Sequence, residues 1–198
     1  MTGPHWSIAP VSTGGSTAEP VSVDEAIVAL RLSDDPHERG YLEHQIRTAR
    51  AALEAEFHQV FIRRQFDLFL DGEPPCRVVT VPVAPLVSVD GIVSFDADQA
   101  QTAMSSSSYY ADTASQPGRV ALARGASWPT NLRDVNGIRI RMTLGHSTAS
   151  SGIPDPIRQA MLQLVAFLTE HRGEAAGEFS MPPQVSELMA PYYIPEVP

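Results

Sequence analysis

The chain has 198 residues, which is enough for one domain or for a domain that carries an insertion. Its 23 acidic and 14 basic residues give a formal net charge of −9, which argues against tight DNA binding because phosphate neutralisation needs clustered cations. Cys76 is the single cysteine, so an internal disulfide is excluded and a reducing cytoplasm is expected.

The N-terminal 20 residues are rich in Gly, Ser, Thr and Pro, and this composition predicts a flexible arm without a core of its own. Ser22 and Glu25 then have the spacing of a capping box, in which each residue bonds the other's backbone N–H. They predict a short helix with a small apolar face. The run from Ser33 to Pro36 is expected to end it.

The next segment has the clearest helical periodicity in the chain. Its apolar residues recur every three or four positions and therefore share one face: Leu42, Ile46, Ala49, Leu53 and Phe57. The pairs Glu43–Arg47 and Arg50–Glu54 have the i,i+4 spacing of helix-stabilising ion pairs.

Residues 60–146 are richer in β-branched and aromatic residues and are punctuated by Gly and Pro. Pro117-Gly118 fits the centre of a type II turn, in which Gly takes a positive φ. Two-residue turns are predicted at 71–72, 90–91 and 136–137. The pattern predicts a small antiparallel sandwich or open barrel with six strands at Phe61–Leu70, Arg77–Val81, Leu86–Phe95, Tyr109–Thr113, Arg119–Leu122 and Ile138–Leu144.

A second amphipathic helix is predicted after Pro154, with Asp155 as its cap. Its apolar face comprises Ile157, Ala160, Met161, Leu164, Val165 and Leu168. The fold class is therefore α+β. We expect a helical domain at 21–59 and 152–175 that carries a β insert at 60–147, with an arm at 1–20 and an extended C-terminal segment at 176–198.

Short motifs distributed over residues 20–194 resemble the long form of the tailed-phage head–tail connector (adaptor) family, which also occurs in gene transfer agents. The most specific is YYADTASQPGR at 109–119 with SWP at 127–129. The others are PVSVDEA at 20–26, Leu30-Arg31, RQFDL at 64–68, PLVSV at 85–89, the helix opening at 154–157 and LMAPY at 188–192.

The resemblance implies a structural protein without a cofactor or a reaction. About twelve copies would form a ring beneath the portal protein of a phage or gene transfer agent particle assembled in the bacterial cytoplasm. The ring would extend the DNA channel and offer a surface to the next tail component, a stopper or tail terminator. The acidic balance of the chain is compatible with a pore through which DNA slides without specific binding.

The C-terminal end is apolar and aromatic, and is too short to bury these side chains by itself. Two interpretations remain open: the end folds back onto its own helices, or it docks onto a partner, for which Tyr and Met are well suited. The resemblance favours docking into the portal. The candidate partner-binding residues are Leu188, Met189, Pro191, Tyr192, Tyr193 and Ile194.

We expect no enzyme, metal site or membrane segment. The six histidines lack metal-ligand spacing, and no nucleophile elbow, phosphate loop or dinucleotide fingerprint occurs. No apolar run reaches the roughly 18 residues of a membrane span, and the N-terminus lacks signal-peptide features. Sheet-face arginines at 63, 64, 139 and 141 are expected to form ion pairs. The alternatives are a tail-completion or baseplate protein that contacts neighbours through its β insert, or an enzyme with an unrecognised site.

Overall fold

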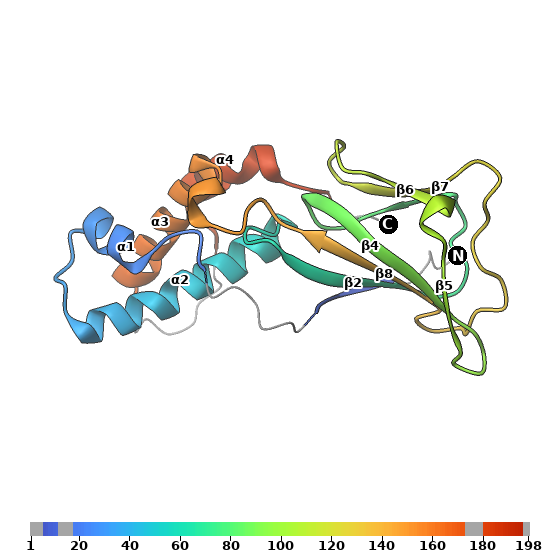
Figure 1. Ribbon diagram of the computed structural model, residues 1–198. Helices are drawn as coiled ribbons and strands as arrows, with labels where there is room; N and C mark the ends of the chain where they lie inside the picture. Colours follow the sequence, from blue (N-terminus) through green and yellow to red (C-terminus); the bar gives the residue numbers. More distant parts are fainter. Residues whose placement is uncertain (1–5, 12–17, 173–179, 196–198) are drawn as a thin grey trace. The chain divides into compact units, whose positions relative to one another are not determined.

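The computed structural model describes residues 6–11, 18–172 and 180–195. The chain divides into two compact units (Figure 1). The β unit comprises residues 1–15, 63–145 and 194–198, and the helical unit comprises residues 16–62 and 146–193. The β insert is thus shorter than the predicted 60–147, because Phe61 is buried in the helical core and Ile62 makes an isolated bridge with Ser147.

Within its described residues, the helical unit has four α-helices, and Figure 1 labels them α1 to α4. Its core joins residues from all four with residues of the connecting segments. Most residues of the two predicted faces are buried in it, and Leu168, the last of the second face, is partly buried against it. The buried ones are Leu42, Ile46, Ala49 and Leu53 with Phe57 at the end of the same helix, and Ile157, Ala160, Met161, Leu164 and Val165 on another. The helices are α1 (Val23–Leu30), α2 (Pro36–Glu56), α3 (Asp155–Glu170) and α4 (Pro183–Met189), and two short 3-10 helices are η2 (Ser150–Gly152) and η3 (Ala190–Tyr192).

Helix α1 begins with the predicted capping box: the Ser22 hydroxyl accepts from the Glu25 N–H at 3.2 Å, and a Glu25 carboxylate oxygen accepts from the Ser22 N–H at 2.8 Å. Helix α2 begins after Asp35, whose carboxylate accepts from the His37 N–H. The prediction that Asp155 caps α3 is wrong. Pro154 occupies the cap position without a side-chain bond, and Asp155 lies in the first turn, where a carboxylate is favoured by the helix dipole.

The described residues of the β unit form two antiparallel sheets, with strand orders β1-β2-β8-β4-β5 and β3-β7-β6. The six predicted strands correspond to β2 (Arg64–Leu70), β3 (Val78–Thr80), β4 (Leu86–Phe95), β6 (Tyr109–Asp112), β7 (Arg119–Leu122) and β8 (Ile138–Leu144). The predicted hairpin is confirmed, with Tyr109 opposite Leu122. A short 3-10 helix, η1 (Ser106–Ser108), precedes it.

Both edge strands of the five-stranded sheet differ from the expectations. The arm was predicted to lack structure, yet β1 (Trp6–Pro10) pairs with β2, placing Trp6 opposite Leu70 and Ile8 opposite Leu68. Backbone pairing and apolar contacts on one face therefore order this segment. The opposite edge is β5 (Gln101–Ala103), which is exposed throughout. Residues 1–5 and 12–17 of the predicted arm lie outside the described residues.

Two predicted turns are wrong. Asp90-Gly91 lies inside β4, at a register shift opposite β8, so the dipeptide marks a bulge and not a reversal. Gly118 does not have the positive φ of a type II turn. Glycine is needed there for a different reason: a Cβ atom would lie 2.5 Å from the Leu86 Cβ. Close packing of the hairpin against β4 therefore explains this residue.

The motif SWP belongs to the long connection between β7 and β8. Its Trp128 is buried, and the indole Nε1 donates to the Cys76 carbonyl oxygen at 2.8 Å. The Arg77 guanidinium donates to the carbonyl oxygens of Ala123 and Ala126. These bonds attach the connection to the two residues that precede β3, and they satisfy polar groups of a loop without regular secondary structure.

Candidate functional site

The predicted docking segment is not extended where it is described, because α4 and η3 occupy most of it. Val185 and Met189 on α4 are fully buried in the helical core, and Leu188 is half-buried against it. Other parts of the predicted segment, at 176–179 and 196–198, lie outside the described residues. The described part therefore folds back onto its own helices, which was one of the two interpretations that the sequence left open.

A buried amide connects this segment to the turn after α2. Gln59 is 2% exposed; its Nε2 donates to the Tyr192 carbonyl oxygen at 2.5 Å, and its Oε1 lies 3.2 Å from His146 Nε2. The His146 and Tyr192 rings meet edge to face at 6.1 Å. The backbone of η3 is thus held by a side chain that is itself fully desolvated, where a lost hydrogen bond costs most.

The six candidate docking residues differ in accessibility. Met189 and Ile194 are buried, so the expectation that they present an apolar surface to a partner does not hold in this structure. Leu188 and Tyr192 are half-buried, and Pro191 is exposed. Tyr193 is 52% exposed and rests against the Phe57 ring, with centroids 6.4 Å apart. Tyr193 and Pro191 are therefore the accessible part of the candidate site.

Burial lowers the pKa of His146 below its ordinary value of 6.5. The unfolded chain therefore binds a proton at this position more readily than the folded chain. The resulting stability is fully present above about pH 6.5 and is lost as the pH falls through the lower, folded-state pKa. We expect denaturant unfolding to show this loss in the wild-type protein, and expect His146→Gln to reduce it. An unchanged pH dependence in the variant would contradict the assignment.

Two arginines of β8, Arg139 and Arg141, have different partners. Arg141 forms the expected ion pair, with Nε 2.8 Å from an Asp67 oxygen. Arg139 instead lies over the Phe95 ring at 5.6 Å, as does Arg133 at 4.3 Å. Among the described residues, no carboxylate lies within ion-pair distance of either Arg133 or Arg139. Periodicity placed Arg139 on this face correctly, but the choice between an acidic and an aromatic neighbour depends on tertiary structure.

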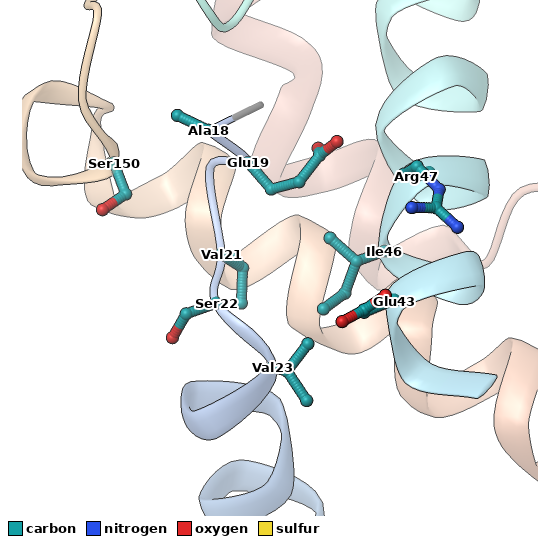
Figure 2. A pocket seen from close by; sticks show the side chains of 9 residues that line it. All are labelled: Ala18, Glu19, Val21, Ser22, Val23, Glu43, Ile46, Arg47 and Ser150. Atoms are coloured by element: carbon teal, nitrogen blue, oxygen red, sulfur yellow. The ribbon is translucent and has the colours of Figure 1, made fainter. Parts of the chain in front are cut away.

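A pocket of about 620 Å³ lies between the segment before α1 and the first half of α2. Figure 2 shows Val21, Val23 and Ile46 pointing toward one another across it, with Glu43 and Arg47 on α2 beside them. The predicted Glu43–Arg47 ion pair is absent from the described residues, whereas Arg50–Glu54 forms at 3.2 Å. Sequence reasoning missed the pocket because segments far apart in the chain build it.

No group of three or more His, Cys, Asp and Glu side chains within 6–11, 18–172 and 180–195 could hold a metal ion. In the same part of the chain, no helix has both the length and the apolar character to cross a membrane.

No protein-family model and no curated protein sequence matches the chain. Solved structures do. The neck of an empty gene transfer agent (GTA) particle computed with C6 symmetry contains a chain that is 25% identical, with a TM-score of 0.80 and coverage of 96% of this chain and 97% of that chain. The chain has the fold of a GTA neck component.

Two further structures agree with this neck-component fold. The virion of a native GTA particle matches at 25% identity, with a TM-score of 0.77 and coverage of 96% of both chains. The neck of a native GTA particle computed with C12 symmetry matches at 24% identity, with a TM-score of 0.73 and coverage of 96% of this chain and 97% of that chain.

The comparisons confirm the resemblance to head–tail connector proteins that the motifs indicated, and they confirm the α+β fold class. They support a structural component in the neck of a phage-like particle, and the C6 and C12 symmetries support a ring oligomer there. The neighbours are particle components, which suggests a structural and not a catalytic function.

Proposed function

We propose that the chain is a head–tail connector that forms a ring of about twelve copies beneath the portal, in a phage or GTA particle assembled in the bacterial cytoplasm. The observation that carries the proposal is the match to GTA neck structures over 96% of the chain at 25% identity. Coverage of both units means that the likeness includes the β insert as well as the helices.

In this proposal the ring extends the DNA channel and presents its other side to the next tail component. The chain has a net charge of −9, so a lumen lined by many copies would carry a strongly negative field. Such a lumen repels phosphates and lets DNA pass without specific binding. No cofactor is needed for this role.

We place the portal contact at the accessible part of the C-terminal segment, around Pro191 and Tyr193. Tyrosine is enriched at binding hot spots because it combines a large apolar area with a polar tip. Buried Met189 and the hydrogen bond from Gln59 to the Tyr192 carbonyl oxygen hold the segment in one conformation. The segment therefore loses little conformational entropy when it docks.

The test is co-sedimentation of the purified chain with isolated portal rings. Deleting the segment would remove core residues such as Val185, so a point substitution is preferable. We expect Tyr193→Ala to weaken binding by about tenfold or more. The matched control is Tyr110→Ala, which removes a 59% exposed tyrosine from β6 and is expected to leave binding unchanged.

The outcomes separate the alternatives. If wild-type protein does not bind portal rings, the portal-docking role is wrong. If Tyr110→Ala abolishes binding and Tyr193→Ala does not, the β unit makes the contact. The β-unit outcome is the one expected of a tail-completion or baseplate protein.

A further inference from the structure

The side-chain amide of Gln59 lies between two partners, and they determine which way it points. The Tyr192 carbonyl oxygen can only accept a hydrogen bond, so the Gln59 atom 2.5 Å from it is the amide nitrogen. The amide oxygen therefore faces the imidazole of His146, 3.2 Å from Nε2. Since an amide oxygen can only accept, the hydrogen of the neutral imidazole lies on Nε2.

The orientation of this amide depends on the imidazole. Among the described residues, the Gln59 side chain has no hydrogen-bond partner besides Tyr192 and His146. Gln59 is 2% exposed, so water cannot readily replace a lost donor. An amide oxygen without a donor in such a site costs free energy, and the amide then gains by rotating away from the Tyr192 carbonyl.

We propose that His146 is a positioning residue for the C-terminal segment: its Nε2–H orients the Gln59 amide, and that amide holds the backbone of η3 in place. Tyr193 follows Tyr192 directly, so a shift of the Tyr192 carbonyl also moves the exposed ring that rests on Phe57. The consequence for docking rests on the proposed function, whereas the consequence for η3 does not.

Titration of the imidazole makes this arrangement sensitive to pH. A second proton leaves the Nε2–H bond to Gln59 intact, but it places a charge in a buried site whose wall includes the Tyr192 ring. Opening of η3 hydrates the charged ring. Burial lowers the pKa of His146 below 6.5, so the closed segment is favoured above about pH 6.5 and loses this advantage as the pH falls through the lower pKa of the closed state.

The neighbouring titratable and charged groups do not reverse this sign. On η3 the group that faces the imidazole is Tyr192, and in the turn after α2 the nearby titratable group is His58, which lies beside Tyr193. On α2 it is Glu54, whose carboxylate is already paired with an arginine of the same helix. A protonated His58, or the cations Arg63 and Arg64 that follow in the chain, would disfavour an imidazolium just as burial does.

The experiment compares full-length wild-type protein with two His146 variants by hydrogen exchange and mass spectrometry. His146→Gln supplies an amide nitrogen as donor and cannot titrate, whereas His146→Leu supplies no donor. At about pH 7.5 we expect residues 183–194 to exchange at least about tenfold faster in the Leu variant, and within about twofold of the wild-type rate in the Gln variant. Peptides from α2 are the internal reference and should exchange alike in all three chains.

A pH comparison gives the second readout and does not require the Leu variant to fold. After correction for intrinsic exchange, a change from about pH 7.5 to about pH 5.5 should accelerate exchange of residues 183–194 severalfold in wild-type protein and not in His146→Gln. His44→Gln is the matched control, because it removes an exposed histidine of α2 and should keep the wild-type response.

The same chains are then sedimented with portal rings, where His146→Leu should bind about tenfold more weakly and His146→Gln as the wild type does. Equal exchange of residues 183–194 in wild-type and Leu chains overturns the positioning role. A Gln variant as fast as the Leu variant overturns it too, because a donor then makes no difference. The expected exchange pattern without portal binding by wild-type protein overturns the proposed portal contact and leaves the role of His146 in η3 intact.

Discussion

Replacing Phe61 by Ala is expected to lower the free energy of unfolding by about 3–5 kcal/mol, the largest stability effect that we predict. The Phe61 side chain is fully buried in the core of the helical unit. The substitution removes the stabilisation that comes from burying the phenyl ring away from water. It also leaves a cavity that the neighbouring helices fill only in part. Urea unfolding followed by the helical circular-dichroism signal measures the loss.

The backbone hydrogen bonds of Phe61 do not depend on its side chain, so the stability change can be assigned to the phenyl ring. Its N–H donates to a Glu54 carboxylate oxygen at 2.8 Å, and its carbonyl oxygen accepts from the His146 N–H at 3.2 Å. Both bonds survive the substitution, so the change reports the side chain alone. Val28→Ala is the control and should change stability by less than about 0.5 kcal/mol, because Val28 is exposed. Equal losses in the two variants would contradict the placement of Phe61.

Replacing Glu54 by Ala is expected to cost about 2–4 kcal/mol. The Glu54 side chain is 9% exposed, and its carboxylate accepts from Arg50 at 3.2 Å as well as from the Phe61 N–H. Without it, the Phe61 N–H loses its acceptor and Arg50 loses one of its two carboxylate partners. Chemical denaturation again measures the change.

Two variants of similar chemistry isolate the cause. Glu54→Gln keeps an oxygen for the Phe61 N–H and removes only the charge, so its loss should be smaller than that of the Ala variant. Glu56→Ala removes an exposed carboxylate two residues away and should stay within about 0.5 kcal/mol of the wild-type protein. If Glu54→Gln were as damaging as Glu54→Ala, the charge and not the hydrogen bond would be responsible.

The helices were predictable because their signals are local. The capping box at Ser22 and Glu25 and the buried stripe from Leu42 to Phe57 depend only on spacing along one helix. The strand alternation of β8 was predictable for the same reason, since successive residues of a strand face opposite sides.

Apart from the cap of α3, where Pro154 and not Asp155 holds the cap position, the failures involve partners distant in sequence. Trp6 and Ile8 alternate with other residues as strand residues do, but the Gly- and Ser-rich composition that follows them predicted an arm without structure. The strand forms because it pairs with β2, more than 50 residues later in the chain. Asp90-Gly91 has the composition of a turn and of a bulge alike, and pairing with β8 decides between them. Burial of Met189 and exposure of Tyr193, four residues apart, follow from where η3 places the chain.

The division of the helical unit into residues 16–62 and 146–193 has a consequence for synthesis on the ribosome. Helix α2 emerges with its apolar face uncovered, because α3 is translated roughly 100 residues later, about 5–20 seconds at usual elongation rates. During that interval the β insert completes its own sheets. The nascent helix is therefore a substrate for chaperones, and slow translation across the insert would lengthen its exposure to aggregation.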